Sequence, residues 1–138
     1  MIWKNPISLE ELNSGPEYIG THLGIQFTDW DDNSLSATMP VNNVTKQPWG
    51  ILHGGASVVL AETIGSYAST FLIDNDKYVA VGLEVNANHL RPATGGKVTG
   101  ICEPFHIGRK THVWNIKIKD ENEKLVCISR LTVAIIEK

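Results

Sequence analysis

One stretch of the chain, residues 47–72, constrains the fold more than any other. It starts as a loop, passes through His53-Gly54-Gly55 and continues with apolar residues near helical spacing. These apolar residues are Val58, Val59, Leu60, Ala61, Ile64, Tyr67, Ala68, Phe71 and Leu72. A helix that is apolar around most of its girth belongs in the interior of a domain. We therefore expect a long central helix over residues 53–72.

A charged residue, Glu62, stands in the middle of this apolar helix, and Ser66 follows four residues later on the same face. A buried carboxylate is costly unless it is paired, hydrogen-bonded or used in function. Two interpretations stay open. Glu62 pairs with a lysine or arginine across an interface, or it serves chemistry in a cleft formed with a second subunit.

The segment His53-Gly54-Gly55 stands where the helix begins. Free backbone N–H groups and the positive end of the helix dipole favour negative charge there, and glycine lets a ligand approach closely. The pattern predicts an oxyanion hole for a carbonyl oxygen, with Gln47 in reach to orient water or substrate. The alternatives are that the glycines only form the turn and that His53 is only a structural hydrogen-bonding residue.

The rest of the chain consists mostly of short alternating segments. Residues 5–15 predict a short helix, 13–24 an irregular segment and 25–41 a hairpin. Further strands are expected at residues 78–90, with Gly82 as a bulge, and at 97–105, 114–118 and 125–136, with 106–110 as a turn. We predict one α+β domain over residues 1–138, an antiparallel sheet wrapped around one long helix. Exposed edge strands predict pairing with a second copy.

Composition narrows the classes of function. A net charge of −3 over 138 residues argues against a nucleic-acid binder. His53 and Glu62 argue against a membrane span at 51–73, and the N-terminus has no secretory signal features, so we expect a cytoplasmic protein. Cys102 and Cys127 are expected as buried thiols in a reducing compartment. The five histidines lack metal-ligand spacing, so no metal is expected.

The segment from Gln47 to Glu62, QPWGILHGGASVVLAE, closely resembles the signature of hotdog-fold acyl-CoA thioesterases. The likeness includes residues 1–4 and 81–89 and is strongest to the branch acting in menaquinone biosynthesis. It implies a hotdog fold and hydrolysis of an aromatic acyl-CoA, with 1,4-dihydroxy-2-naphthoyl-CoA favoured and no cofactor besides the coenzyme A of the substrate. The alternatives are a broad thioesterase for benzoyl-, phenylacetyl- or medium-chain acyl-CoA, a hydroxyacyl dehydratase, whose pattern fits less well, and a non-catalytic acyl-CoA-binding protein.

The same resemblance implies roles for individual residues. Glu62 is the nucleophile or the general base on water, and the Gly54 N–H, helped by His53, polarises the thioester carbonyl. Gln47 and Ser66 position the substrate or the attacking water. Similar proteins are homo-oligomers, dimers or tetramers of paired dimers, with active sites between subunits. Gln47 and His53 are therefore expected to face Glu62 of the partner subunit.

Two basic segments, residues 89–91 and 106–110, are expected to form one cluster that resembles the coenzyme A site of this family. Arginine and lysine suit phosphate groups, and the Gly108 turn can present backbone N–H groups to them. The expected binding residues are Trp49, Gly82, His89, Leu90, Arg91, Pro92, His106, Ile107, Gly108, Arg109, Lys110 and Thr111. In similar proteins an aromatic ring at the position of Trp49 lies beside the acyl pocket, so this indole is expected either to narrow the pocket or to stack on a flat acyl group. The alternative is that the two basic segments are solvated turns.

Overall fold

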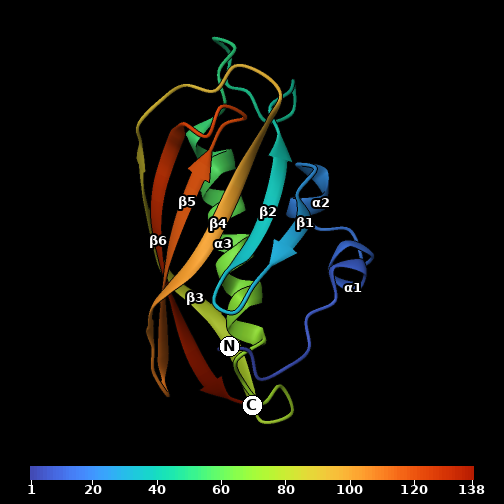
Figure 1. Ribbon diagram of the computed structural model, residues 1–138, viewed down its shortest axis with the longest axis vertical. Helices are drawn as coiled ribbons and strands as arrows, with labels where there is room; N and C mark the ends of the chain where they lie inside the picture. Colours follow the sequence, from blue (N-terminus) through green and yellow to red (C-terminus); the bar gives the residue numbers. More distant parts are fainter.

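The fold is an antiparallel sheet curved around one long helix (Figure 1), seen in a computed structural model of all 138 residues. The elements are α1 (Leu9–Asn13), α2 (Ile19–His22), β1 (Gln26–Trp30), β2 (Leu35–Pro40), α3 (Gly54–Thr70), β3 (Tyr78–His89), β4 (Lys97–Ile107), β5 (Thr111–Lys119) and β6 (Leu125–Glu137). The six strands form one sheet in the order β1-β2-β4-β5-β6-β3. The predicted α+β hotdog arrangement is confirmed.

The central helix α3 lies against the concave side of the sheet because its buried side carries small residues. These are Ala56, Ser57, Ala61, Gly65, Ala68 and Ser69, together with the larger Leu60 and Ile64. A Cβ atom at Gly65 would lie 2.5 Å from Leu131, and one at Gly100 of β4 would lie 2.7 Å from Ile64. Helix and sheet therefore touch at two glycines. The opposite side of α3, which carries Glu62, is only half-buried.

A buried polar network joins the C-terminal half of α3 to the sheet. The Trp114 indole N–H donates to Ser69 Oγ at 2.8 Å, and His112 Nδ1 lies 2.9 Å from the same oxygen. The His112 side chain is buried, and this burial is the main cause that lowers its pKa from the usual 6.5. His112 is therefore a neutral structural residue, held between the helix and the sheet.

The structure changes two boundaries expected from the sequence. The segment 13–24 is not irregular throughout, because it contains the one-turn helix α2, which begins after Tyr18. His106 and Ile107 do not belong to a turn, because both pair with β5 as the last residues of β4. The turn is confined to residues 108–110. The predicted bulge is confirmed, since the register of β3 against β6 shifts between Gly82 and Glu84.

The two ends of the molecule differ in what they carry. At the upper end of Figure 1 lie the start of α3 and the loops before it and after β3, whereas both chain termini lie at the lower end. None of the three helices has the length and hydropathy needed to cross a bilayer. Cys102 and Cys127 are buried and unpaired, as predicted.

Candidate active site

The start of α3 presents a free backbone donor. The His53 side chain caps the helix, with Nδ1 accepting from the Gly55 N–H at 2.8 Å. The N–H groups of Ala56 and Ser57 reach the His53 carbonyl oxygen. The Gly54 N–H has no acceptor within the helix, being its first residue, and none in the surrounding loops. It is therefore available to a ligand oxygen.

The cap also determines the tautomer of His53. A ring nitrogen that accepts a hydrogen bond carries no proton, so the proton of the neutral imidazole resides on Nε2. The His53 side chain is exposed, and its Nε2–H is therefore a second donor near the helix start. Two of the predicted polarising groups, Gly54 and His53, thus lie together.

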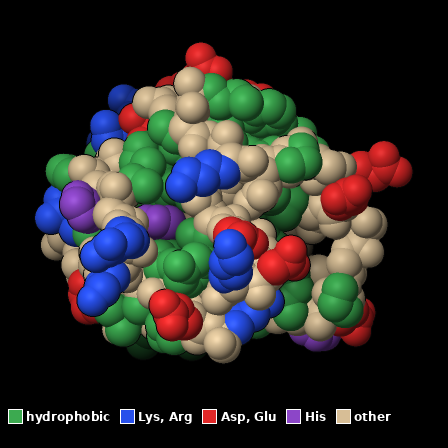
Figure 2. All heavy atoms as spheres, turned by 90° about the horizontal axis from the view of Figure 1, so that it is seen from below, with side chains coloured by type: hydrophobic (Ala, Val, Ile, Leu, Met, Phe, Trp, Pro, Cys, Tyr) green, Lys and Arg blue, Asp and Glu red, His purple; other side chains and the backbone are tan.

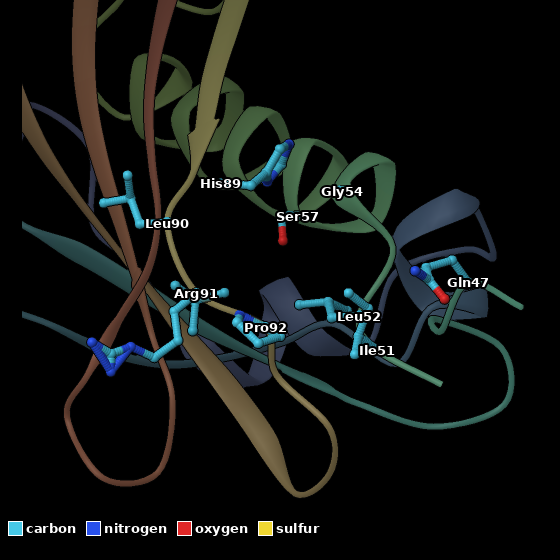
Figure 3. Close-up of a pocket in the computed structure, with 10 residues that line it drawn as sticks. Gln47, Ile51, Leu52, Gly54, Ser57, His89, Leu90, Arg91 and Pro92 are labelled. Atoms are coloured by element: carbon cyan, nitrogen blue, oxygen red, sulfur yellow. The ribbon is translucent and has the colours of Figure 1, made fainter. Parts of the chain in front are cut away.

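An open cleft of about 440 Å³ lies beside this helix start (Figure 3). Ten residues line it: Gln47, Ile51, Leu52, Gly54, Ser57, His89, Leu90, Arg91, Pro92 and Val126. Six of these were predicted from the sequence, whereas Ile51, Leu52, Ser57 and Val126 were missed. Ser57 follows Gly54 by three residues and therefore shares its helix face, a spacing that could have identified it.

The loop before α3 forms one wall of the cleft and is held by backbone hydrogen bonds. The Leu52 N–H donates to Ala93 O and the His53 N–H to Thr45 O, both at 2.8 Å. Gln47 lines the cleft, and its Oε1 accepts from the Trp49 N–H at 2.5 Å, which leaves the amide NH₂ group free to donate. Trp49 itself is 86% exposed and does not line the cleft.

Glu62 lies outside this cleft, at the middle of α3 and against Gly82 of β3. The only ion pairs in the structure are Lys77–Asp74 and Lys119–Glu123, so the half-buried carboxylate of Glu62 has no cationic partner in the chain. A Cβ atom at residue 82 would overlap Glu62 Oε2. Gly82 thus makes space for the carboxylate, and Ser66 lies one turn further along on the same half-buried side.

A single chain does not bring the predicted acid and the predicted donor together. Eight residues separate Gly54 from Glu62 on α3, a rise of about 12 Å along the helix axis. One thioester carbonyl cannot contact both groups across that distance. The hydrolytic arrangement expected from the sequence is therefore incomplete within one copy.

The two basic segments expected to form one cluster lie at opposite ends of the molecule. Residues 89–92 lie at the cleft, near the start of α3, whereas Gly108 and Arg109 lie beside Leu72 and Ile73 after its end. The 17 residues of α3 alone span about 25 Å. Lys, Arg and His side chains gather at the left of the molecule seen from below (Figure 2), the side of the β4–β5 turn in Figure 1. The expectation of a single cluster is wrong for one copy of the chain.

Comparison with known proteins identifies the family. Residues 50–127 match the family model described as Thioesterase superfamily. The chain is 53% identical over 137 residues to the 1,4-dihydroxy-2-naphthoyl-CoA hydrolase of Escherichia coli, covering 99% of this chain and 100% of that protein. It is 48% identical over 139 residues to the proofreading thioesterase EntH of Cronobacter sakazakii, covering 99% of each.

Solved structures agree with this assignment. The crystal structure of a mutant thioesterase from Pseudomonas aeruginosa superposes with a TM-score of 0.98 at 50% identity, covering 100% of both chains. A thioesterase from Haemophilus influenzae superposes with a TM-score of 0.94 at 46% identity, covering 99% of this chain and 96% of that one. The chain belongs to the thioesterase superfamily and is a thioester hydrolase with the hotdog fold.

Proposed function

We propose that the protein hydrolyses an aromatic acyl-CoA thioester, with 1,4-dihydroxy-2-naphthoyl-CoA favoured, at active sites shared between two copies of the chain. The observation that carries the proposal is a pair of unused groups. The Gly54 N–H has no acceptor, and the half-buried Glu62 carboxylate has no cationic partner. A backbone donor for an oxyanion and a free carboxylate are the groups that acyl transfer to water requires.

In the proposed reaction, the Gly54 N–H and the His53 Nε2–H bind the thioester carbonyl oxygen. Glu62 either attacks the carbonyl carbon or removes a proton from an attacking water, and the two donors stabilise the oxygen as it becomes negative. On the general-base route, collapse of the tetrahedral intermediate breaks the carbon–sulfur bond, and the coenzyme A thiolate takes up the proton that Glu62 removed from water. On the direct route, loss of the thiolate leaves an anhydride between the acyl group and Glu62. Water then hydrolyses this anhydride, which frees the acid, restores the carboxylate and supplies the proton for the thiolate. Gln47 and Ser66 position the substrate or the water. The reaction needs no metal or other cofactor.

Pairing of two copies through β3 supports the sharing of sites. β3 is the last strand of the sheet, so its outer edge is unpaired, and Val79, Val81 and Leu83 on it are between 41% and 62% exposed. Antiparallel pairing of two such edges about a two-fold axis turns one α3 end for end relative to the other. The start of α3 in one copy then approaches the partner's Glu62. Such pairs can assemble further into tetramers.

The same pairing provides a role for the β4–β5 turn. In a two-fold pair, the lower end of one copy lies at the same end of the assembly as the cleft of the other. Arg109 and Lys110 of one copy, with Arg91 of the other, then supply positive charge for the phosphates of coenzyme A. Both basic segments predicted from the sequence keep their proposed role, with contributions from two chains.

Mixed dimers test the shared site directly. Chains carrying Glu62→Gln and chains carrying His53→Ala, co-expressed with different tags and purified through both, are expected to regain activity that neither parent has. Each mixed dimer holds one site with both changes and one with neither, so its kcat is expected to be about half that of wild type. Thiol release measures this.

The matched control for the mixed dimers pairs Glu62→Gln with the double variant Glu62→Gln/His53→Ala. This combination contains no intact site under any arrangement, so it is expected to stay inactive. If the mixed dimers of Glu62→Gln and His53→Ala chains are no more active than either parent, Glu62 and His53 act from the same chain. That result contradicts the shared site.

The acyl group is proposed from two observations. One relative is named as a hydrolase of 1,4-dihydroxy-2-naphthoyl-CoA. We assign the same reaction to this protein, as a step of menaquinone biosynthesis in the cytoplasm. The exposed indole of Trp49 offers a flat surface, which the partner can complete, for an aromatic acyl group. The alternative is a thioesterase of broad specificity. The similarity to a protein described as a proofreading thioesterase favours this alternative.

A substrate panel tests the proposed function. Thiol release is measured with 1,4-dihydroxy-2-naphthoyl-, benzoyl-, phenylacetyl- and medium-chain acyl-CoA. We expect kcat/KM for the naphthoyl thioester to exceed that for the medium-chain thioester by about 100-fold, because a flat ring fills an aromatic pocket that a flexible chain does not. Equal values across the panel indicate the broad thioesterase. Binding of all four without release of thiol indicates a non-catalytic acyl-CoA-binding protein.

A further inference from the structure

Ser57 differs from every other fully buried hydroxyl residue of the chain. Four such side chains are at most 1% exposed: Thr45, Ser57, Ser69 and Ser129. Thr45 and Ser129 donate to backbone carbonyl oxygens at 2.8 and 2.7 Å, and Ser69 accepts from an indole N–H at 2.8 Å. Ser57 forms no side-chain hydrogen bond within the chain. Because no fully buried side-chain nitrogen or oxygen of the structure lacks a partner, the Ser57 oxygen reaches the surface of the cleft. Its hydroxyl is therefore the one left open to a ligand.

The Ser57 hydroxyl points into the cleft beside the start of α3. It lines the cleft with Leu52, Pro92 and Val126, and Figure 3 shows its oxygen directed away from the helix towards the open centre. Buried hydroxyls normally have a hydrogen-bond partner in native proteins, and this one can take its partner from a ligand that fills the cleft. The apolar side chains beside it lower the local dielectric once a ligand fills the cleft, so a hydrogen bond to that ligand is stronger there than in solution.

We propose that Ser57 is a positioning residue that hydrogen-bonds the amide nearest the sulfur in the pantetheine arm of the thioester. The proposal rests on the proposed function, because it starts from a thioester carbonyl bound at the Gly54 N–H. Residues three apart on a helix are neighbours, about 5 Å apart at Cβ. The amide nitrogen of the arm lies three bonds beyond the sulfur, a comparable span.

The composition of the cleft fits such an arm. Pantetheine alternates amides with apolar methylene groups, and the cleft combines the Ser57 hydroxyl and other polar groups with the apolar side chains of Leu52 and Val126. A serine hydroxyl both donates and accepts, so it can bond either the N–H or the carbonyl of the amide. Arg91 follows on the cleft wall, where the arm leads towards the phosphates of coenzyme A.

Thioesters of one acyl group with three leaving groups test the contact: coenzyme A, N-acetylcysteamine, which keeps only the amide nearest the sulfur, and propanethiol, which has none. For Ser57→Ala we expect KM to rise about three- to tenfold with the first two and to stay unchanged with the third, because one neutral hydrogen bond is lost. The melting temperature stays at or above that of wild type, since no hydrogen bond of the fold is removed.

Ser129→Ala is the matched control. It also deletes a buried hydroxyl, but one that bonds the Asn86 carbonyl oxygen and not a ligand. It is expected to lower the melting temperature and to leave the ratio of KM values among the three thioesters unchanged. Two results for Ser57→Ala overturn the proposal: an equal loss with all three thioesters, which places the hydroxyl on the acyl group or the reacting carbonyl, and no change with any of them.

A binding measurement separates this proposal from the proposed function. Titration calorimetry of coenzyme A with wild type and Ser57→Ala requires no turnover, and the variant is expected to bind about three- to tenfold more weakly. If wild type hydrolyses no thioester yet shows this difference, the proposed function fails and the contact stands. If wild type hydrolyses thioesters and the two proteins bind coenzyme A equally, the contact fails alone.

Discussion

Replacement of Glu62 by glutamine is expected to lower kcat for thioester hydrolysis by about 10³-fold. The amide has the shape of the carboxylate but can neither attack a carbonyl nor take a proton from water. The carboxylate has no ion pair in the chain, so the substitution removes no ion pair of the fold and the melting temperature is expected to stay unchanged. Thiol release and calorimetry measure the two quantities.

The control for Glu62→Gln is Glu103→Gln, which neutralises an exposed acid on β4 and is expected to keep wild-type activity. A Glu62→Gln protein that retains a tenth or more of wild-type kcat contradicts the assignment. A single turnover in ¹⁸O-labelled water then separates the two routes. An unlabelled acid with the label in Glu62 shows direct attack, because water has then opened an anhydride at the Glu62 carboxyl carbon. General-base catalysis always places the label in the acid product and never in Glu62.

A methyl group at position 82 is expected to reduce kcat/KM by about 100-fold, although this residue performs no chemistry. The Cβ atom of Gly82→Ala overlaps Glu62 Oε2, so the carboxylate must move by more than a small adjustment. Displacement of a reacting group by about 1 Å is sufficient for a loss of this size. The same assay measures it, with circular dichroism to verify the fold.

Two further variants show whether the loss of activity in Gly82→Ala comes from the overlap with Glu62. Gly95→Ala is the matched control, because nothing lies within 4 Å of a Cβ atom there, and it is expected to keep full activity. In the double variant Gly82→Ala/Glu62→Asp, the shorter acid makes room for the methyl group. Its activity is expected to exceed that of Gly82→Ala alone. Full activity of Gly82→Ala would show that Glu62 does not react from the position seen here.

Much of the fold could be predicted because its elements are long and their patterns regular. The central helix and the strands each repeat their period several times, which is sufficient to distinguish a helix from a strand. The helix α2 was missed because its four residues form barely one turn, too short for any period. The end of β4 was placed too early because Gly108 and its basic neighbours indicate a turn, whereas His106 and Ile107 continue the ladder.

Six residues of the cleft could be selected from the sequence, but not the whole arrangement of the basic segments. Glu62 was expected to be buried, whereas it is half-buried. Glu62 and the start of α3 were expected to meet across subunits, and eight residues of helical rise place them on different levels of α3. The joining of His89 and His106 in one cluster is wrong for one chain. β3 and β4 run in opposite directions, so the last residues of the two strands lie at opposite ends of the sheet.

The close approach of α3 to the sheet limits how new substrate preferences can evolve. Where Gly65 meets Leu131 and Gly100 meets Ile64, the glycines have no side chain to shorten, and shortening Leu131 or Ile64 leaves a core cavity that destabilises the fold. Any added volume has to come from the half-buried side of α3, where Val58, Val59 and Thr63 are found. Laboratory evolution towards longer or bulkier thioesters should therefore randomise these three positions and leave the interior unchanged.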